Sequence, residues 1–230
     1  MPFGLFYGNY FWLLLLGALI SIWAQMKVNT TFNKYSKVMS SQAIPANQVA
    51  RQILDQNGLS DVPIELVKGN LTDHYDPRSK TLRLSETVYS SRSVAAIGVA
   101  AHEVGHAIQD STDYAPLRIR NTLAPVAQIG SSISWVLILM GLISSYGNLV
   151  QWGIIAFAAI VLFQLVTLPV EFNASSRALA ALEGGGFLAR DEVDQSRKVL
   201  SAAALTYVAA AIVGILQLLR LVLIFGNRRD

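Results

Sequence analysis

The sequence predicts a mainly α membrane protein with about four transmembrane helices and a small α+β domain. Of its 230 residues, 53% are hydrophobic and only 14% are charged, which is too apolar for an ordinary water-soluble domain. The charged residues also fall into blocks, separated by uncharged stretches that are long enough to cross a bilayer. The uncharged stretches therefore predict the spans, and the blocks between them predict the α+β domain.

The first apolar stretch, residues 1–26, predicts an N-terminal transmembrane anchor. No charged residue precedes Lys27, and a helix through Tyr10 to Met26, extended by the apolar residues before it, can cross a hydrocarbon core of about 30 Å. The basic n-region and the small-x-small cleavage site of a signal peptide are both missing. We therefore expect the anchor to remain uncleaved.

Residues 121–170 predict a transmembrane helical hairpin. The stretch between Arg120 and Glu171 carries no charge and has room for two spans of about 20 residues. Turn-forming residues at 144–148 divide it into two halves. Residues 199–230 then predict a last transmembrane helix and a short tail.

The hairpin returns the chain to the side that it left, so the polar segments 27–120 and 171–198 face one compartment. Basic residues are enriched on the cytoplasmic side of a membrane, and three of them follow the first span: Lys27, Lys34 and Lys37. Two arginines after the last span, Arg228 and Arg229, favour the opposite orientation. Because the lysines outnumber the arginines, we expect a multi-pass protein of the cell membrane whose polar segments face the cytoplasm.

The first polar segment predicts a helix, a small sheet and a second helix. Apolar periodicity over 46–57 predicts a short amphipathic helix. Residues that favour strands at 62–67 and 80–84, with turn residues between them, predict a small sheet or hairpin. The Ala-rich stretch 93–109 predicts a buried helix with a serine at its start as the cap.

This second helix carries the motif HExxH. His102 and His106 lie one helical turn apart, so both imidazoles can bind one metal ion. Glu103 lies between them and can reach a water on that ion, while we expect Gly105 to leave open room next to the site. The chain has no cysteine, so a zinc ion must be held by His, Asp or Glu.

A catalytic zinc ion needs a third protein ligand and an open position for water. Glu171 is the candidate, because it is the first charged residue after the hairpin and enters the compartment of the HExxH helix. His74 is a rival third ligand. In either case Glu103 is the expected general base for a water activated by zinc.

Four further residues have candidate roles. His74, Tyr75 and Arg78 precede the HExxH helix on the predicted β segment, where they could contact the substrate or the transition state. The alternative is that the residues from 76 to 79 simply form a turn. Arg177 lies roughly opposite Glu171 on a helix, so we expect a structural or lipid-facing ion pair.

The residues around Glu171 resemble the second zinc motif of membrane gluzincins such as HtpX-type and CAAX prenyl proteases. In that motif a glutamate opens a helix and binds zinc, which corresponds to Glu171, and a small residue follows, which corresponds to Ala174. Ser175 stands where those proteases usually have an aspartate that orients a histidine ligand. The resemblance implies a gluzincin-type site from which Ser175 departs.

Over nearly its whole length the chain also resembles the YugP-like family of bacterial neutral zinc metallopeptidases. The resemblance rests on four segments, at 32–36, 73–78, 100–107 and 168–175. It implies a multi-pass membrane zinc protease, and we expect the catalytic segments 27–120 and 171–198 to form a zincin-like metallopeptidase domain of a short sheet plus the HExxH helix. One zinc ion is the implied cofactor.

The expected function is that of a membrane-embedded zinc endopeptidase. Its expected partners are a peptide or membrane-protein substrate and the lipid bilayer, while no motif indicates nucleic acid and the oligomeric state is open. One alternative is a catalytically silent zinc-binding scaffold or chaperone, which would not need Glu103. Another is a transporter or channel accessory protein, against which the uncharged hairpin argues.

Overall fold

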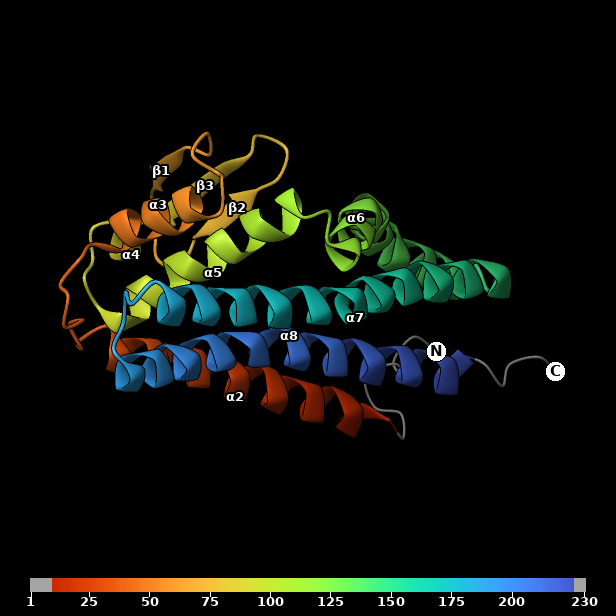
Figure 1. Cartoon of the computed structure of the whole chain (residues 1–230). Helices are drawn as coiled ribbons and strands as arrows, with labels where there is room; N and C mark the ends of the chain where they lie inside the picture. Colours follow the sequence, from red (N-terminus) through yellow and green to blue (C-terminus); the bar gives the residue numbers. More distant parts are fainter. Residues whose placement is uncertain (1–9, 226–230) are drawn as a thin grey trace. The chain divides into compact units, whose positions relative to one another are not determined.

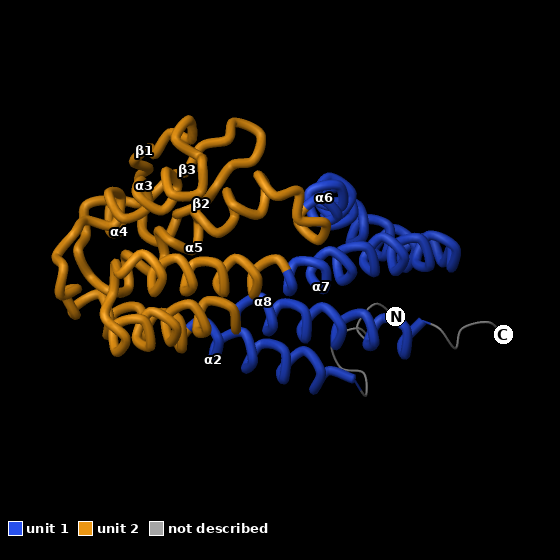
Figure 2. The backbone as a smooth tube through the Cα atoms, in the orientation of Figure 1, with its two compact units in different colours: residues 1–25, 118–169, 206–230 blue, residues 26–117, 170–205 orange. Residues whose placement is uncertain are grey.

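The computed structural model describes residues 10–225, which are mostly helical with one small sheet (Figure 1). Residues 1–9 of the expected anchor and 226–230 of the expected tail, with Arg228 and Arg229, lie outside the described residues. The chain divides into two compact units (Figure 2). Unit 1 takes in the described parts of 1–25, 118–169 and 206–230, and unit 2 consists of 26–117 and 170–205.

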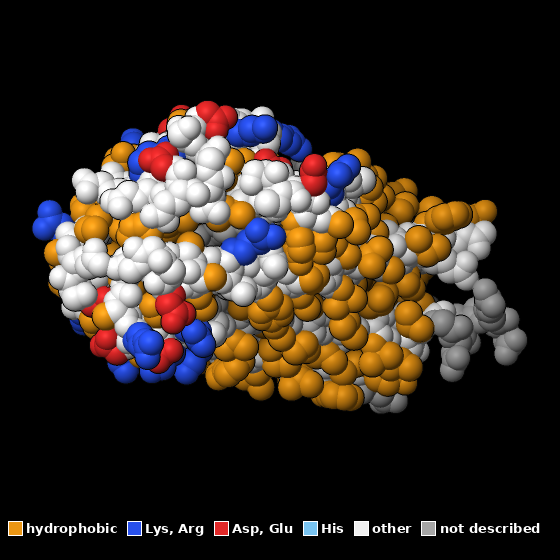
Figure 3. Space-filling view, viewed as in Figure 1, with side chains coloured by type: hydrophobic (Ala, Val, Ile, Leu, Met, Phe, Trp, Pro, Cys, Tyr) orange, Lys and Arg blue, Asp and Glu red, His pale blue; other side chains and the backbone are white. Residues whose placement is uncertain are grey.

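Unit 1 is built from the apolar parts of four long helices: α2 (Phe11–Tyr35), α6 (Ala115–Ile143), α7 (Gly147–Gly184) and α8 (Arg190–Phe225). Each helix is long and apolar enough to cross a membrane, by its length and composition. In Figure 3 hydrophobic side chains cover the helices of unit 1, and charged side chains gather over unit 2. The predicted fold class, a mainly α membrane protein with a small sheet, is therefore confirmed.

Helices α6 and α7 form a hairpin in unit 1. Helix α6 ends at Ile143 and α7 begins at Gly147, so the connection lies at the predicted turn. The Ser134 hydroxyl donates a hydrogen bond of 2.9 Å to the carbonyl oxygen of Gly153. A Cβ atom on Gly153 would lie 2.6 Å from a side-chain carbon of Ile138, so the glycine permits a close approach, as small residues do between membrane helices.

Unit 2 contains a three-stranded mixed sheet in the order β1-β3-β2. Strand β1 (Ile64–Val67) pairs in parallel with β3 (Thr81–Ser85), and β2 (His74–Asp76) pairs with β3 in antiparallel. The two stretches that favour strands thus form β1 and β3 of the predicted small sheet, but they pair in parallel and not as a hairpin, and the third strand, β2, lies between them in the sequence. Strand β2 lies at an edge of this sheet.

The two faces of the sheet differ in character. Tyr75 of β2 pairs with Leu82 of β3, and His74 pairs with Arg83. Because side chains alternate along a strand, Tyr75 and Leu82 share one face, here called the inner face, and His74 and Arg83 share the outer face. Leu82 is fully buried, whereas His74 is exposed.

The inner face packs against helices α3 (Ala46–Gln56) and α5 (Val94–Ser111) in one hydrophobic core, which also includes side chains of the short α4 (Glu86–Tyr89), α7 and α8. Apolar side chains on one side of α3 join this core, as the predicted amphipathic helix requires. Helix α5 begins where Ser93 accepts a hydrogen bond of 3.2 Å from the backbone N–H of Ala96. The predicted serine cap is therefore confirmed.

Helix α7 corrects one expectation. The resemblance implies that Glu171 opens a helix, but α7 continues without a break from Gly147 to Gly184, and Glu171 lies inside it. The reason is that helix-forming and apolar residues flank Glu171 with no turn signal among them, and Pro169 does not end the helix. The second half of the predicted hairpin and the predicted third ligand therefore belong to one helix.

Candidate metal centre

Three side chains of unit 2 converge on one point, His102 and His106 from α5 and Glu171 from α7. The Glu171 Oε2 atom lies 3.3 Å from His102 Nε2 and 3.7 Å from His106 Nε2. One ligand atom of each residue lies within 4.8 Å of the others. The two imidazole rings stand nearly perpendicular, at 84°. These are the three residues that the sequence analysis predicts as zinc ligands.

The three donors fit a zinc ion. Two atoms that each lie about 2.1 Å from one tetrahedral zinc ion are about 3.4 Å apart, close to both distances from Glu171. The Oε2 atom of Glu171 is buried and accepts no hydrogen bond from residues 10–225. A buried carboxylate oxygen without such a partner is costly unless a cation faces it. Two imidazoles and one carboxylate also leave a fourth position for water.

Gly105 allows α5 and α7, the helices that carry the three converging side chains, to meet. A Cβ atom on Gly105 would lie 2.5 Å from the carbonyl oxygen of Ala174 and 3.2 Å from its Cα atom. The expectation that Gly105 leaves open room next to the site is therefore wrong, because the backbone of α7 fills that room. This close crossing brings His106 and Glu171 to one point although 65 positions separate them in the sequence.

Each histidine of the triad also has a partner at its second ring nitrogen. His102 Nδ1 lies 3.1 Å from the Ser175 hydroxyl, and His106 Nδ1 lies 3.0 Å from Gln109 Oε1. Ser175 thus contacts a histidine from the position where the related motif has an aspartate, so the departure still supplies a hydrogen-bonding group. Both Nε2 atoms remain directed at Glu171.

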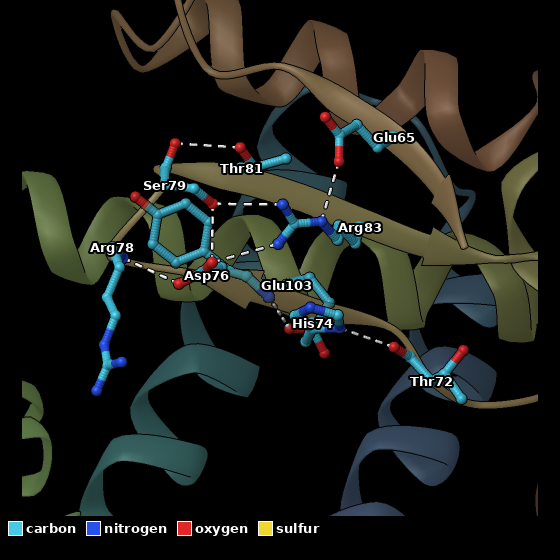
Figure 4. Close-up of polar contacts among 10 residues, drawn as sticks. Glu65, Thr72, His74, Asp76, Arg78, Ser79, Thr81, Arg83 and Glu103 are labelled. Atoms are coloured by element: carbon cyan, nitrogen blue, oxygen red, sulfur yellow. Dashed lines mark hydrogen bonds and ion pairs between the residues drawn. The ribbon is translucent and has the colours of Figure 1, made fainter. Parts of the chain in front are cut away.

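Glu103 is held from the open edge of β2. Its Oε2 atom accepts a hydrogen bond of 3.0 Å from the backbone N–H of Tyr75 (Figure 4). The Tyr75 hydroxyl donates a hydrogen bond of 2.9 Å to Asp110, also on α5. Burial and then the bond to Asp110 raise the pKa of Tyr75, so its hydroxyl remains a donor. The edge strand is therefore fastened to the HExxH helix at two points.

Acidic side chains set the electrostatics around the triad. Burial lowers the pKa of His106, but its contacts with Glu171 and Glu103 outweigh burial, and the net pKa is raised. Burial raises the pKa of Asp73, and the charge of Glu103 raises it further against the hydrogen bonds from Ser85. The negative charges of Glu171 and Glu103 beside His106 favour a cation at this place.

His74 and Arg78 are not brought to the triad. His74 lies on the outer face, where its Nδ1 atom is 2.8 Å from the carbonyl oxygen of Thr72 (Figure 4). Arg78 has an exposed side chain on the turn after β2, and its backbone N–H donates to Asp76 at 3.0 Å. The rival third ligand, His74, is thus absent from the group of converging donors in residues 10–225.

Arg83 organises the rest of the outer face. It forms ion pairs of 3.0 Å with Glu65 and 3.3 Å with Asp76 (Figure 4). Hydrogen bonds from Ser79 and then from the Arg78 backbone lower the pKa of Asp76 to about 2. These contacts tie the three strands and the turn together on the side that faces away from α5.

Sequence reasoning missed Gln109 and Asn173 and misjudged Arg177. Gln109 is fully buried and contacts His106 directly, and its position three residues later on the same helix face was a usable signal. Arg177 donates a hydrogen bond of 2.8 Å to Asn173, and its guanidinium carbon lies 5.8 Å from the ring centre of Tyr114. Within residues 10–225 it forms no ion pair, so the expected ion pair is wrong.

Comparisons with known proteins identify the family. The family model described as "Putative neutral zinc metallopeptidase" matches residues 10–226. The "Putative membrane protease YugP" of Bacillus subtilis (strain 168) is 53% identical over 211 residues, which cover 92% of this chain and 94% of that protein. No solved structure matches the chain. The chain therefore belongs to the neutral zinc metallopeptidase family, which is the family that its sequence motifs resemble.

Proposed function

We propose that this chain is a multi-pass zinc endopeptidase of the cell membrane, in which His102, His106 and Glu171 hold one zinc ion. The observation that carries the proposal is the convergence of three donor atoms within 4.8 Å, one of them a buried carboxylate oxygen that accepts no hydrogen bond from residues 10–225. Membership of the family supports it. Zinc at this position supplies Lewis acidity, which lowers the pKa of water and polarises a peptide carbonyl.

Glu103 is the proposed general base. Its carboxylate takes a proton from the attacking water and later gives that proton to the leaving amine. Glu103 lies next to the first ligand in the sequence but is not one of the converging donors, which leaves its carboxylate free for proton transfer. The hydrogen bond from the Tyr75 N–H holds this carboxylate at the edge of the sheet.

Strand β2 is the proposed docking edge for an extended segment of a peptide or membrane protein. An edge strand presents backbone groups with which an extended peptide can pair. The Tyr75 N–H points from this edge to Glu103, so a peptide lying along β2 would pass beside the base. His74 and Arg78 flank the edge and are proposed to contact parts of the substrate away from the zinc ligands.

The catalytic unit is proposed to face the cytoplasm, because Lys27, Lys34 and Lys37 follow the first span. The natural lack of cysteine permits a single-cysteine test. In intact cells an impermeant maleimide should label a cysteine at Ser145, in the hairpin turn, and spare one at Gln48, on α3. Labelling of Gln48→Cys but not of Ser145→Cys would reverse the orientation.

Substitution of Glu103 tests the enzyme assignment. Glu103→Ala should keep zinc at the wild-type ratio while proteolysis falls by about 10²–10⁴-fold, the usual contribution of a general base. The matched control is Glu183→Ala, which removes an exposed glutamate of α7 and should change neither zinc nor activity. Zinc content and cleavage of membrane-protein mixtures, followed by mass spectrometry, give both readouts.

Retained proteolysis in Glu103→Ala would remove Glu103 as the base. If the wild-type protein bound zinc but cleaved nothing that the Glu103→Ala protein traps, the zinc-binding scaffold would be the better description. Proteins captured by Glu103→Ala and cleaved by the wild type would identify the substrate class.

A further inference from the structure

We infer that Gln109, Asn173 and Arg177 form a positioning chain that holds His106 in the tautomer whose Nε2 atom can bind the metal. The inference rests on the proposed function, since it concerns a ligand of the same zinc ion. It adds three residues for which neither the HExxH motif nor the comparisons give a role. Each is a positioning residue, because it acts through His106 and touches no reacting atom.

The direction of the Gln109 side chain follows from its contact with a carbonyl group. One terminal atom of Gln109 lies 2.8 Å from the carbonyl oxygen of Val170, and a carbonyl oxygen can only accept a hydrogen bond. That terminal atom must therefore be the amide nitrogen. The other, Oε1, then faces His106 Nδ1 at 3.0 Å, so Nδ1 carries the hydrogen.

Asn173 and Arg177 fix the same direction independently. The Arg177 Nε–H can only donate, so the Asn173 atom that it contacts at 2.8 Å must be the oxygen Oδ1. That oxygen also accepts from Gln109 Nε2 at 3.0 Å. The guanidinium of Arg177 lies over the face of the Tyr114 ring, and this contact holds Arg177, the first residue of the positioning chain, in place.

Burial makes this arrangement difficult to reverse. Gln109 is fully buried. A turned amide would set its oxygen against two acceptors, the Val170 carbonyl and Asn173 Oδ1, and would leave the buried groups without partners. With the hydrogen of His106 on Nδ1, the lone pair of Nε2 is directed to the side of Glu171.

The hydrogen-bond partner of His102 does not fix its tautomer in this way. Its Nδ1 atom contacts the hydroxyl of Ser175, which can either donate or accept. This contact orients the ring of His102 but does not determine which of its nitrogens carries the hydrogen. In the zinc-loaded protein the metal would determine it. The positioning chain therefore acts on one of the two histidines.

Zinc affinity tests the inference in the full-length protein. In competition with a chelator, Gln109→Leu should bind zinc about 10–100-fold more weakly than the wild type, the usual loss when the partner of a ligating histidine is removed. Asn173→Leu should weaken zinc binding less, while Asn173→Asp keeps the acceptor and should bind as the wild type does. Gln56→Leu, on the exposed side of α3, is the control.

The three histidines allow a direct view of the tautomer. In zinc-loaded protein labelled with 15N-histidine, His106 should show a hydrogen-bonded Nδ1–H. Gln109→Leu should move this signal and leave the signal of His74 unchanged. A general loss of packing would instead change the signals of both histidines. Asn173 is half-buried, so Asn173→Leu gives the same test if Gln109→Leu fails to fold.

Wild-type zinc affinity in Gln109→Leu, or an unchanged Nδ1 signal in both leucine variants, would overturn the inference and leave the proposed function standing. A wild-type protein that binds no zinc would overturn both. The two failures are therefore distinguishable.

Discussion

The polar side chains on the two sides of the small sheet differ in what they contact. On the inner side, the Tyr75 hydroxyl donates to Asp110 of α5, and at the strand edge the Tyr75 backbone N–H donates to Glu103 of the same helix. On the outer side, Arg83 and His74 contact other residues of the sheet and its turns. Strand alternation therefore separates the polar side chain that contacts α5 from those that contact the sheet and its turns.

The same contrast orders the effects of substitution. Changes at the crossing of α5 and α7 act on a buried, closely packed region, and changes on the outer face act on partly exposed ion pairs. Removing a buried contact lowers the free energy of unfolding more than removing an exposed ion pair does. The effects of substitution should therefore decrease from the crossing of α5 and α7 to the outer face of the sheet.

Gly105→Ala is expected to have the largest effect. The added methyl group would meet the carbonyl oxygen of Ala174 at 2.5 Å, so α5 and α7 must move apart. Overpacking of this kind costs about 1–3 kcal/mol of unfolding free energy, and the same movement should separate His106 from Glu171 and release zinc. Thermal unfolding and metal analysis measure the two effects.

Gly184→Ala is the matched control, because a Cβ atom at that position of α7 would meet nothing within 4 Å. It should match the wild type in zinc content and in melting temperature. If Gly105→Ala behaved in the same way, the close crossing would not be what assembles the site.

Much of this region could be predicted from the sequence, for local reasons. The i, i+4 spacing placed His102 and His106 on one helix face, and the uncharged stretch before Glu171 marked where that carboxylate follows a span. The contacts of Gln109 with Val170 and Asn173 could not be predicted, since they join residues 61 and 64 positions apart. The role of Gly105 was missed because it depends on the backbone of a second helix.

Ser175→Ala is expected to have the next largest effect. It removes the hydroxyl that contacts His102 Nδ1, and loss of such a partner usually weakens metal affinity by about 10–100-fold. Ser175→Asp supplies the acceptor of the related motif and should bind zinc at least as well as the wild type. Ser176→Ala, at the exposed neighbouring position, serves as the control. Equal affinities in Ser175→Ala and Ser176→Ala would deny Ser175 any role in holding the ligand.

Tyr75→Phe should have a smaller effect. It removes the hydrogen bond to Asp110, worth about 0.5–1.5 kcal/mol, and loosens the edge strand that carries the N–H bound to Glu103. We expect a modest fall in kcat/KM with unchanged zinc content. Tyr89→Phe, in which the ring packs on the core, is the comparison. A loss of zinc in Tyr75→Phe would mean that β2 supports the proposed zinc ligands as well as the proposed base.

The outer face should be the least sensitive. His74→Ala should change the free energy of unfolding by less than about 0.5 kcal/mol, and Arg83→Ala should also have only a small effect, because the contacts of both residues are partly exposed. Zinc content should remain at the wild-type value in both variants. Loss of zinc from His74→Ala would restore His74 as a ligand and erase the difference between the two faces.

The metal content of the purified protein tests the central claim most directly. The wild-type chain should carry one zinc ion, and Glu171→Ala should carry almost none, because Glu171 supplies the carboxylate between the two imidazoles. A wild-type protein without a bound divalent cation, or zinc held at wild-type affinity by Glu171→Ala, would contradict the account.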